Sequence, residues 1–142
     1  MKKIMMIGRS GCGKTTLTQV LQNQEIGYKK TQAIEFFNNA IDTPGEYIEN
    51  RRFYNALIVS AADCDIIALL QSSIDEQCIF PPGFATSFAK PVIGIITKSD
   101  LCENEDDLNR SKEFLKEAGV EKIYTISSLK NHGVDEITKL LK

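Results

Sequence analysis

The sequence predicts one domain, residues 1–142, with a three-layer α/β fold: a mostly parallel six-stranded sheet, one antiparallel edge strand, and helices on both faces. Two observations predict it. Short apolar segments alternate along the chain with longer segments of helical periodicity. The apolar segments also lack polar alternation, so the strands are expected to be buried on both faces, as in a parallel sheet.

The first elements follow from local pattern. Residues 3–7, KIMMI, suit a buried strand, and residues 14–24 place Leu17, Val20 and Leu21 on one face of a helix. The segment 33–42 has an Asn-Asn pair at its centre, which is typical of hairpin turns, so it predicts two very short strands. The hairpin supplies the antiparallel edge.

The middle of the chain continues the alternation. Residues 51–63 predict a helix with the apolar spacing i, i+3, i+4, i+7 at Tyr54, Leu57, Ile58 and Ala61. Residues 65–71 predict a buried strand. Two prolines and a glycine in 78–90 leave room for only a short helix.

The last elements have the clearest signals. Residues 91–97 and 122–127 predict strands. The segment 105–119 begins with acidic residues and ends with glycine, which is typical of a helix. Residues 133–142 predict a final amphipathic helix with Val134, Ile137 and Leu141 on one face.

Charge and composition exclude several classes of protein. The net charge is −2, from 17 basic and 19 acidic side chains, which gives no basic excess for a nucleic-acid partner. The start MKKIMMIG imitates a signal peptide, but RSGCGK interrupts it, and no segment has the roughly 18 apolar residues of a membrane span. A cytoplasmic protein with no membrane partner is expected. The four cysteines form no Cys-x-x-Cys pair, so free thiols are expected, and Cys12 is interpreted as an ordinary loop residue rather than a redox group.

Residues 8–15, GRSGCGKT, fit the phosphate-binding pattern Gly-x-x-x-x-Gly-Lys-[Ser/Thr] between a strand and a helix. Glycines let backbone N–H groups approach phosphate oxygens, and the helix start adds partial positive charge. Lys14 is expected to reach the outer phosphates and Thr15 to bind Mg²⁺. The residues expected to bind the nucleotide here are Gly8, Arg9, Ser10, Gly11, Cys12, Gly13, Lys14, Thr15 and Thr16.

Two later motifs bear on which nucleotide binds. In IDTPG (41–45), Asp42 can hold Mg²⁺ and Gly45 can bring its N–H to a terminal phosphate, although this is also a common turn composition. In TKSD (97–100), the Asp100 carboxylate can accept from the two adjacent donors of guanine, and Lys98 can cover the base. Taken alone, TKSD is more typical of a turn that Asp100 caps, with Lys98 in solvent.

The three motifs occur in order at strand ends, where open α/β sheets bind ligands. Essentially the whole chain resembles the Ras-like and Era-like GTP-binding domains, which have the P-loop NTPase fold. The resemblance implies GTP or GDP as ligand, with ATP as the alternative, and Mg²⁺ held by Thr15, Thr31 and Asp42. It also implies that the loop at 127–133 approaches the guanine. The residues implied at the base are Thr97, Lys98, Asp100, Leu101, Ser127, Ser128 and Leu129.

The chain also resembles a compact family, EutP/PduV, in the segments KTQAIEF, IDTPGEYIENRRFYNAL and GIITKSDL. Only ten residues separate Thr31 from Asp42. The resemblance implies a role in bacterial ethanolamine or propanediol utilisation, with the ethanolamine branch favoured because the chain starts directly at the first strand. It also implies association with a microcompartment, with a shell protein or a pathway enzyme as partner.

The resemblance implies a slow GTPase switch with Lys14, Thr31, Gly45 and Glu46 as catalytic residues. Ras-like hydrolases carry glutamine at the position of Glu46. A carboxylate cannot donate a hydrogen bond, and it repels the terminal phosphate. Two alternatives stay open: a small-molecule kinase that phosphorylates acetate, and a docking module that does not hydrolyse nucleotide.

Overall fold

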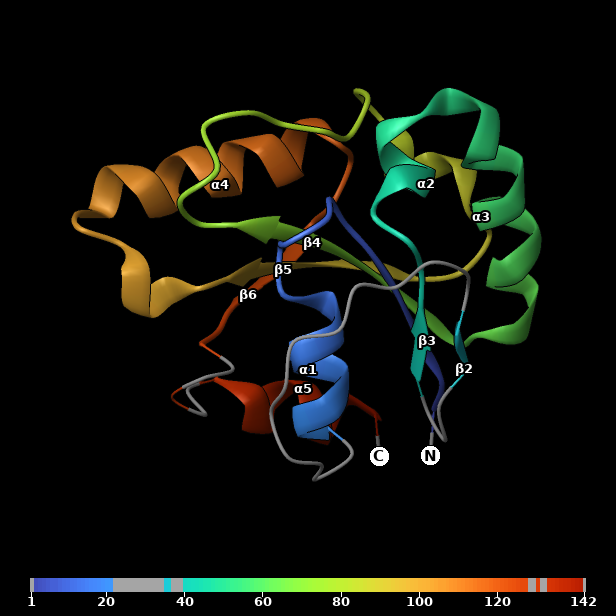
Figure 1. Cartoon of the computed structure of the whole chain (residues 1–142), viewed down its shortest axis with the longest axis horizontal. Helices are drawn as coiled ribbons and strands as arrows, with labels where there is room; N and C mark the ends of the chain where they lie inside the picture. Colours follow the sequence, from blue (N-terminus) through green and yellow to red (C-terminus); the bar gives the residue numbers. More distant parts are fainter. Residues whose placement is uncertain (1, 22–34, 37–39, 128–129, 131–132, 142) are drawn as a thin grey trace.

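Figure 1 shows the computed structural model, which describes residues 2–21, 35–36, 40–127, 130 and 133–141. Its six-stranded sheet has the order β2-β3-β1-β4-β5-β6. All neighbouring strands pair in parallel except β2 and β3, which are antiparallel. The strands are β1 (Ile4–Ile7), β2 (Glu35–Phe36), β3 (Ala40–Asp42), β4 (Ile66–Ser72), β5 (Val92–Thr97) and β6 (Lys122–Thr125).

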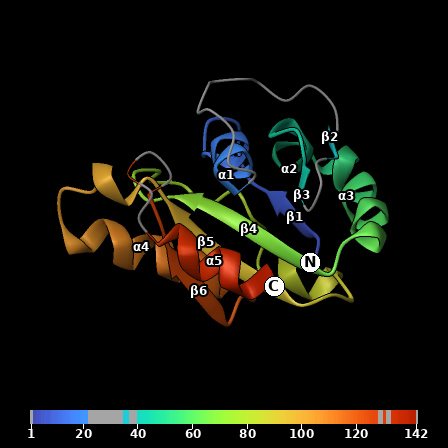
Figure 2. The ribbon, with the colours of Figure 1, turned by 90° about the horizontal axis from the view of Figure 1, so that it is seen from below.

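Helices cover both faces of this sheet, as Figures 1 and 2 show. The helices are α1 (Lys14–Leu21), α2 (Glu46–Glu49), α3 (Tyr54–Ser60), α4 (Glu105–Glu117) and α5 (Val134–Leu141). Met5 and Ile7 pack in one core with α2, α3 and α4. Ile4 and Met6 pack in the second core with α1 and α5. Because successive side chains of a strand point to opposite faces, β1 contributes side chains to both cores. The α/β fold predicted from the apolar strands is confirmed.

Strand register brings the ends of the central strands together. Met6 pairs with Asp42, and Ser72 pairs with Thr97. The carboxyl ends of β1, β3, β4 and β5 therefore lie along one edge of the sheet. The loops that follow these strands, which carry the three motifs, gather at this edge.

The segment 51–63 differs from its prediction as one helix. It forms a 3₁₀ turn (Arg51–Phe53), the helix α3 and a second 3₁₀ turn (Ala61–Asp63), preceded by α2. Asn50 has an extended backbone, and its side chain accepts from Arg52 N, so it separates α2 from the next turn. Leu57 is buried, but Ile58 is 42% exposed. The predicted apolar face is therefore wrong at Ile58, which lies within α3 but is not covered by the core.

The other predicted elements agree with the structure to within a few residues. The short helix in 78–90 is a 3₁₀ turn (Phe84–Ser87), and α4 is followed closely by Gly119, whose φ is +96°. Residues 22–24 of the first predicted helix and the Asn-Asn pair of the hairpin lie outside the described residues. The strand predicted at 122–127 is β6, which is half-buried or exposed because it lies at the edge of the sheet.

Candidate functional site

The P-loop, residues 8–13, joins β1 to α1 and needs its glycines for different reasons. Gly11 and Gly13 have φ of +81° and +105°, a region that other residues rarely adopt. Gly8 is required for space, because an added Cβ would lie 2.6 Å from Cys12 Sγ and 2.9 Å from Leu70 O. The glycines therefore give the loop the backbone shape of an anion-binding concavity.

The Cys12 side chain points into the protein. It is buried in the core shared with Leu17, and burial raises the pKa of its thiol. A protonated, buried thiol is a poor nucleophile. The interpretation of Cys12 as an ordinary loop residue fits this environment.

Lys14, the first residue of α1, folds back over the loop. Its side chain is buried, and Nζ donates to the carbonyl oxygens of Gly8 at 2.8 Å and Arg9 at 3.2 Å. These oxygens carry only partial negative charge, so the ammonium keeps its ability to attract an anion. Lys14 thus places positive charge within the P-loop, as the motif predicts.

Thr15 and Asp42 form the second part of the site. Thr15 Oγ1 donates to Asp42 Oδ2 at 2.7 Å, and Asp42 is completely buried at the end of β3. Thr43 Oγ1 donates to Met6 O at 2.7 Å and attaches this segment to β1. Hydroxyl and carboxylate oxygens are the ligands that Mg²⁺ prefers, so the donor chemistry fits this ion.

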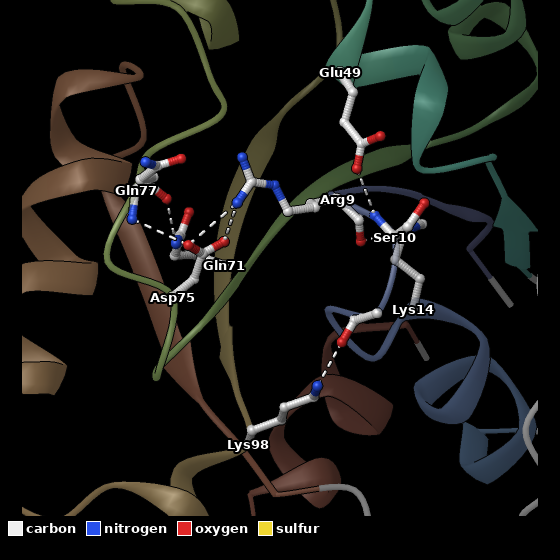
Figure 3. A network of polar contacts seen from close by, with 9 residues as sticks. Arg9, Ser10, Lys14, Glu49, Gln71, Asp75, Gln77 and Lys98 are labelled. Carbon is white, nitrogen blue, oxygen red and sulfur yellow. Dashed lines mark hydrogen bonds and ion pairs between the residues drawn. The ribbon is translucent and has the colours of Figure 1, made fainter.

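The TKSD segment is held directly against the P-loop. Thr97 Oγ1 donates to Cys12 O. Lys98 Nζ donates to the P-loop carbonyl of Gly11 (Figure 3). Lys98 has φ of +58°, and its carbonyl accepts from Ser73 Oγ at 2.8 Å. Two side chains from the end of β5 therefore join the phosphate-side loop to the segment that carries Asp100.

Asp100 lies in the 3₁₀ turn that follows β5 (Ser99–Leu101), where Ser127 fixes its position. Ser127 is buried, and its Oγ donates to Asp100 Oδ1 at 2.6 Å. This hydrogen bond is the main cause that lowers the pKa of Asp100 below its ordinary value. Asp100 therefore carries an ionised carboxylate whose orientation Ser127 fixes.

Two acidic side chains that sequence reasoning missed contact the other side of the P-loop. Arg9 Nη1 donates to both Asp75 carboxylate oxygens, at 3.1 and 3.3 Å, and Ser10 N donates to Glu49 Oε1 at 3.1 Å (Figure 3). Asp75 follows the carboxyl end of β4, and this position could have indicated that its side chain lies near the P-loop. Nothing in the local sequence marks Glu49, because its contact crosses 39 residues.

The structure brings most of the predicted residues to one edge of the sheet. Gly45 lies so close to the P-loop that an added Cβ would overlap Ser10 N and Oγ. Thr16 is half-buried on α1, whereas Glu46 and Leu101 are exposed. The predicted residues Thr31, Ser128 and Leu129 lie outside the described residues.

The sequence model of the PduV-EutP family, described as "Ethanolamine utilisation - propanediol utilisation", matches residues 1–142. The chain belongs to the PduV-EutP family. It is 46% identical over 137 residues to the propanediol utilization protein PduV of Citrobacter freundii, covering 96% of this chain and 91% of that protein. It is 34% identical over 143 residues to the probable acetate kinase EutP of Escherichia coli, covering 99% and 87%.

Solved structures with similar folds support the same architecture. A single-residue variant of Aquifex aeolicus Era bound to GDP.AlF4⁻ aligns with a TM-score of 0.65 and 22% identity. That alignment covers 99% of this chain and 56% of the Era chain. Era in complex with MgGDPNP and ribosomal RNA aligns with a TM-score of 0.64 and 18% identity, covering 98% and 55%. This PduV-EutP chain therefore has the P-loop NTPase fold of nucleotide-binding proteins.

Two further expectations concern where the protein acts and in which pathway. Among the described residues of this PduV-EutP chain, no helix is long and apolar enough to cross a membrane. The cytoplasmic location stays a prediction. The ethanolamine branch also stays a prediction, and the higher identity to the propanediol protein does not favour it.

Proposed function

We propose that this chain binds GTP and GDP with Mg²⁺, hydrolyses GTP slowly, and acts as a nucleotide-dependent switch in ethanolamine or propanediol utilisation. The observation that carries the proposal is Asp100, which Ser127 orients beside a P-loop already joined to Lys98. An ionised carboxylate accepts from the ring N–H and the amine of guanine. Adenine presents an acceptor at the first of these positions, and such a polar mismatch discriminates strongly.

The remaining residues of the proposed site would contact the phosphates and Mg²⁺. The P-loop N–H groups and the buried Lys14 would hold phosphate oxygens, and Thr15 and Asp42 would hold Mg²⁺ with Thr31. When bound, Mg-GTP supplies the phosphoanhydride bond that is broken and the charge that stabilises the leaving oxygen. Gly45 would approach the terminal phosphate, since it lies on the P-loop at Ser10.

Slow hydrolysis follows from Glu46. It is exposed at the start of α2, where Ras-like hydrolases carry a glutamine that orients water. Its carboxylate can accept from water but cannot donate to a phosphate oxygen. Arg9, the arginine within the P-loop, forms an ion pair with Asp75, so its charge is already engaged away from the terminal phosphate. We expect turnover on the order of 10⁻⁴ s⁻¹ or below, as in unassisted small GTPases.

The surface that changes with the nucleotide would include α2 and α3. Tyr47 and Phe53 stack with ring centroids 4.6 Å apart, and both rings are half-exposed. Ile58 and Val59 are 42% and 64% exposed on α3. We expect a microcompartment shell protein or a pathway enzyme to contact this surface in the cytoplasm, and neither a nucleic acid nor a membrane.

The test is a titration with GTP, GDP, ATP and xanthosine nucleotides in Mg²⁺, measured by calorimetry. The wild type should prefer guanine nucleotides, and Asp100→Asn should move the preference toward xanthine nucleotides. Asp63→Asn serves as the control, since Asp63 lies before β4, at the opposite edge of the sheet. ATP bound as tightly as GTP would refute the guanine assignment.

The second candidate is a small-molecule kinase. The 34% identical Escherichia coli relative has the name probable acetate kinase, and Arg9 holds a carboxylate, that of Asp75, beside the P-loop. The γ-phosphoryl group of ATP or GTP would pass to an acetate oxygen, giving acetyl phosphate and the nucleoside diphosphate.

Trapping acetyl phosphate with hydroxylamine distinguishes the candidates. Acyl phosphate formed in proportion to nucleotide consumed supports the kinase. Slow phosphate release that acetate does not change supports the switch. Nucleotide binding without either product supports the non-hydrolysing docking module.

A further inference from the structure

A P-loop amide is occupied by an acidic side chain from a distant part of the chain. Ser10 N donates to Glu49 Oε1 at 3.1 Å, and Glu49 is the last residue of α2 (Figure 3). Backbone N–H groups of this loop are the groups that bind phosphate oxygens. A carboxylate therefore occupies a donor of the kind that the phosphate chain needs.

Gly45 approaches the same amide. A Cβ at Gly45 would overlap Ser10 N and Oγ, so the DTPG segment lies directly on this part of the loop. The amides of Ile48 and Glu49 each donate to Gly45 O at 3.2 Å. Gly45 and Glu49 are thus the two ends of one helical turn that covers Ser10. In the proposed function, this is where the terminal phosphate meets Gly45.

The two cationic side chains of the P-loop segment, Arg9 and Lys14, bind groups other than Glu49. The Arg9 guanidinium is paired with Asp75, whose Oδ1 also accepts from Gln77 N at 3.0 Å. The Lys14 ammonium donates to loop carbonyls beneath. The donors of residues 9 and 10 therefore both face carboxylates, as the network in Figure 3 shows.

Glu49 and a terminal phosphate exclude each other at Ser10. A carboxylate and a phosphate oxygen can both only accept, so a single N–H cannot serve both well, and their negative charges repel. A nucleoside diphosphate lacks the γ-phosphate, so no γ-phosphate oxygen competes with Glu49 for this amide.

We propose that Glu49 selects the phosphorylation state of the bound nucleotide: its carboxylate on Ser10 N favours the diphosphate, and a triphosphate binds by displacing Glu49 together with α2. This inference rests on the proposed guanine-nucleotide binding. It assigns to Glu49 the coupling between the terminal phosphate and the α2–α3 surface. Displacement is driven by the differential affinity of the two states for the terminal phosphate.

The experiment measures the dissociation constants of Mg-GDP and of the non-hydrolysable Mg-GDPNP for wild type, Glu49→Gln, Glu49→Ala and the control Glu121→Gln. Glu121 is exposed next to the edge strand β6, away from the P-loop. Both Glu49 variants should tighten GDPNP binding by about five- to tenfold and leave GDP binding within about twofold, because one charge-assisted hydrogen bond is removed. Glu121→Gln should leave both constants unchanged.

A second readout follows the Ser10 amide itself by ¹H–¹⁵N NMR. In the wild type, GDPNP should shift the Ser10 amide resonance and GDP should leave it near its position in the nucleotide-free protein. In Glu49→Ala the nucleotide-free resonance should already be shifted.

The outcomes separate the two hypotheses. An unchanged ratio of GDPNP to GDP affinity in both Glu49 variants, with GDP binding intact, would overturn the role of Glu49 alone. Absence of guanine-nucleotide binding in every protein, wild type included, would overturn the proposed function and this inference together.

Discussion

Asp100 and Ser127 follow different strands, β5 and β6, and a hydrogen bond joins their side chains. The Ser127 hydroxyl donates its hydrogen bond to Asp100 Oδ1, which fixes the orientation of the carboxylate and stabilises its negative charge. Ser127 is buried, so its orientation is restricted by packing. The carboxylate that we propose recognises the base therefore depends on a residue with no charge of its own.

Replacing this hydroxyl gives the first prediction. Ser127→Ala should raise the pKa of Asp100 toward its ordinary value of about 3.9 and weaken GDP binding several-fold, because the carboxylate loses its main stabilising donor. The pKa is lowered in the folded protein, so the hydrogen bond stabilises the fold above the unfolded pKa and is lost as pH falls through the folded value. The variant lacks this contribution, so its stability should change less than that of the wild type as pH falls through the pKa values of Asp100. NMR titration of the Asp100 carboxyl carbon measures both pKa values, and identical values would contradict the assigned cause.

Glu46 gives a second prediction. Glu46→Gln should raise single-turnover GTP hydrolysis by about tenfold, because an amide can orient water and donate to a phosphate oxygen. Glu46 is exposed, so the change should leave folding and GDP affinity unaltered. Phosphate release after rapid mixing is the measurement. A slower Glu46→Gln variant would instead identify the carboxylate as a base.

Local sequence sets both ends of the helix α4. Asn104 has an extended backbone, and its Oδ1 accepts from Asp107 N at 3.2 Å, which satisfies one of the free N–H groups at the helix start. Glu105, Asp106 and Asp107 follow it and complement the helix dipole. At the other end, Ala118 precedes Gly119 in the left-handed region. These signals explain why the bounds of α4 match the sequence pattern.

Removing this cap should lower stability by a predictable amount. Asn104→Ala should reduce the free energy of unfolding by about 1 kcal/mol, because Asp107 N loses its acceptor. Asn109→Ala, at an exposed position inside the same helix, should be neutral or slightly stabilising, since alanine is the better helix former. Urea unfolding monitored by circular dichroism compares the two variants. Equal losses would show that the cap contributes nothing.

The molecule as a whole links its binding edge to its two cores. β1 contributes Met5 and Ile7 to one core and Ile4 and Met6 to the other, and the P-loop starts immediately after it. Asp42 and Thr97 end the strands β3 and β5. Ligand contacts at this edge are therefore connected to the packing on both faces of the sheet.

Ligand binding should accordingly stabilise the whole fold. Mg-GDP at about 100 times its dissociation constant should add about 2.7 kcal/mol and raise the melting temperature by about 8 °C. Mg-ATP at the same concentration should produce no shift. Lys14→Ala should still unfold cooperatively, but its melting temperature should not respond to GDP, because the buried ammonium of the P-loop is gone. Differential scanning calorimetry tests all three expectations, and an equal shift with ATP would count against guanine selectivity.

By itself, the sequence determined the elements and the motifs, because both depend on neighbours along the chain. Short continuous apolar segments predicted the central strands, and glycines with Lys14 and Thr15 predicted the P-loop. The order of the motifs predicted that Asp42, Thr97 and Asp100 would meet at one sheet edge. Each of these inferences needs only local steric rules and the direction of parallel strands.

Only the tertiary structure decided which groups meet across long separations. Glu49 reaches Ser10 across 39 residues, and Asp75 reaches Arg9 across 66. Neither contact follows from residue type, because many exposed carboxylates could have served. The division of 51–63 into short helical turns, and the exposure of Ile58, likewise depended on packing against the rest of the molecule. Strand register and helix packing set these positions, and they are properties of the assembled sheet rather than of any one segment.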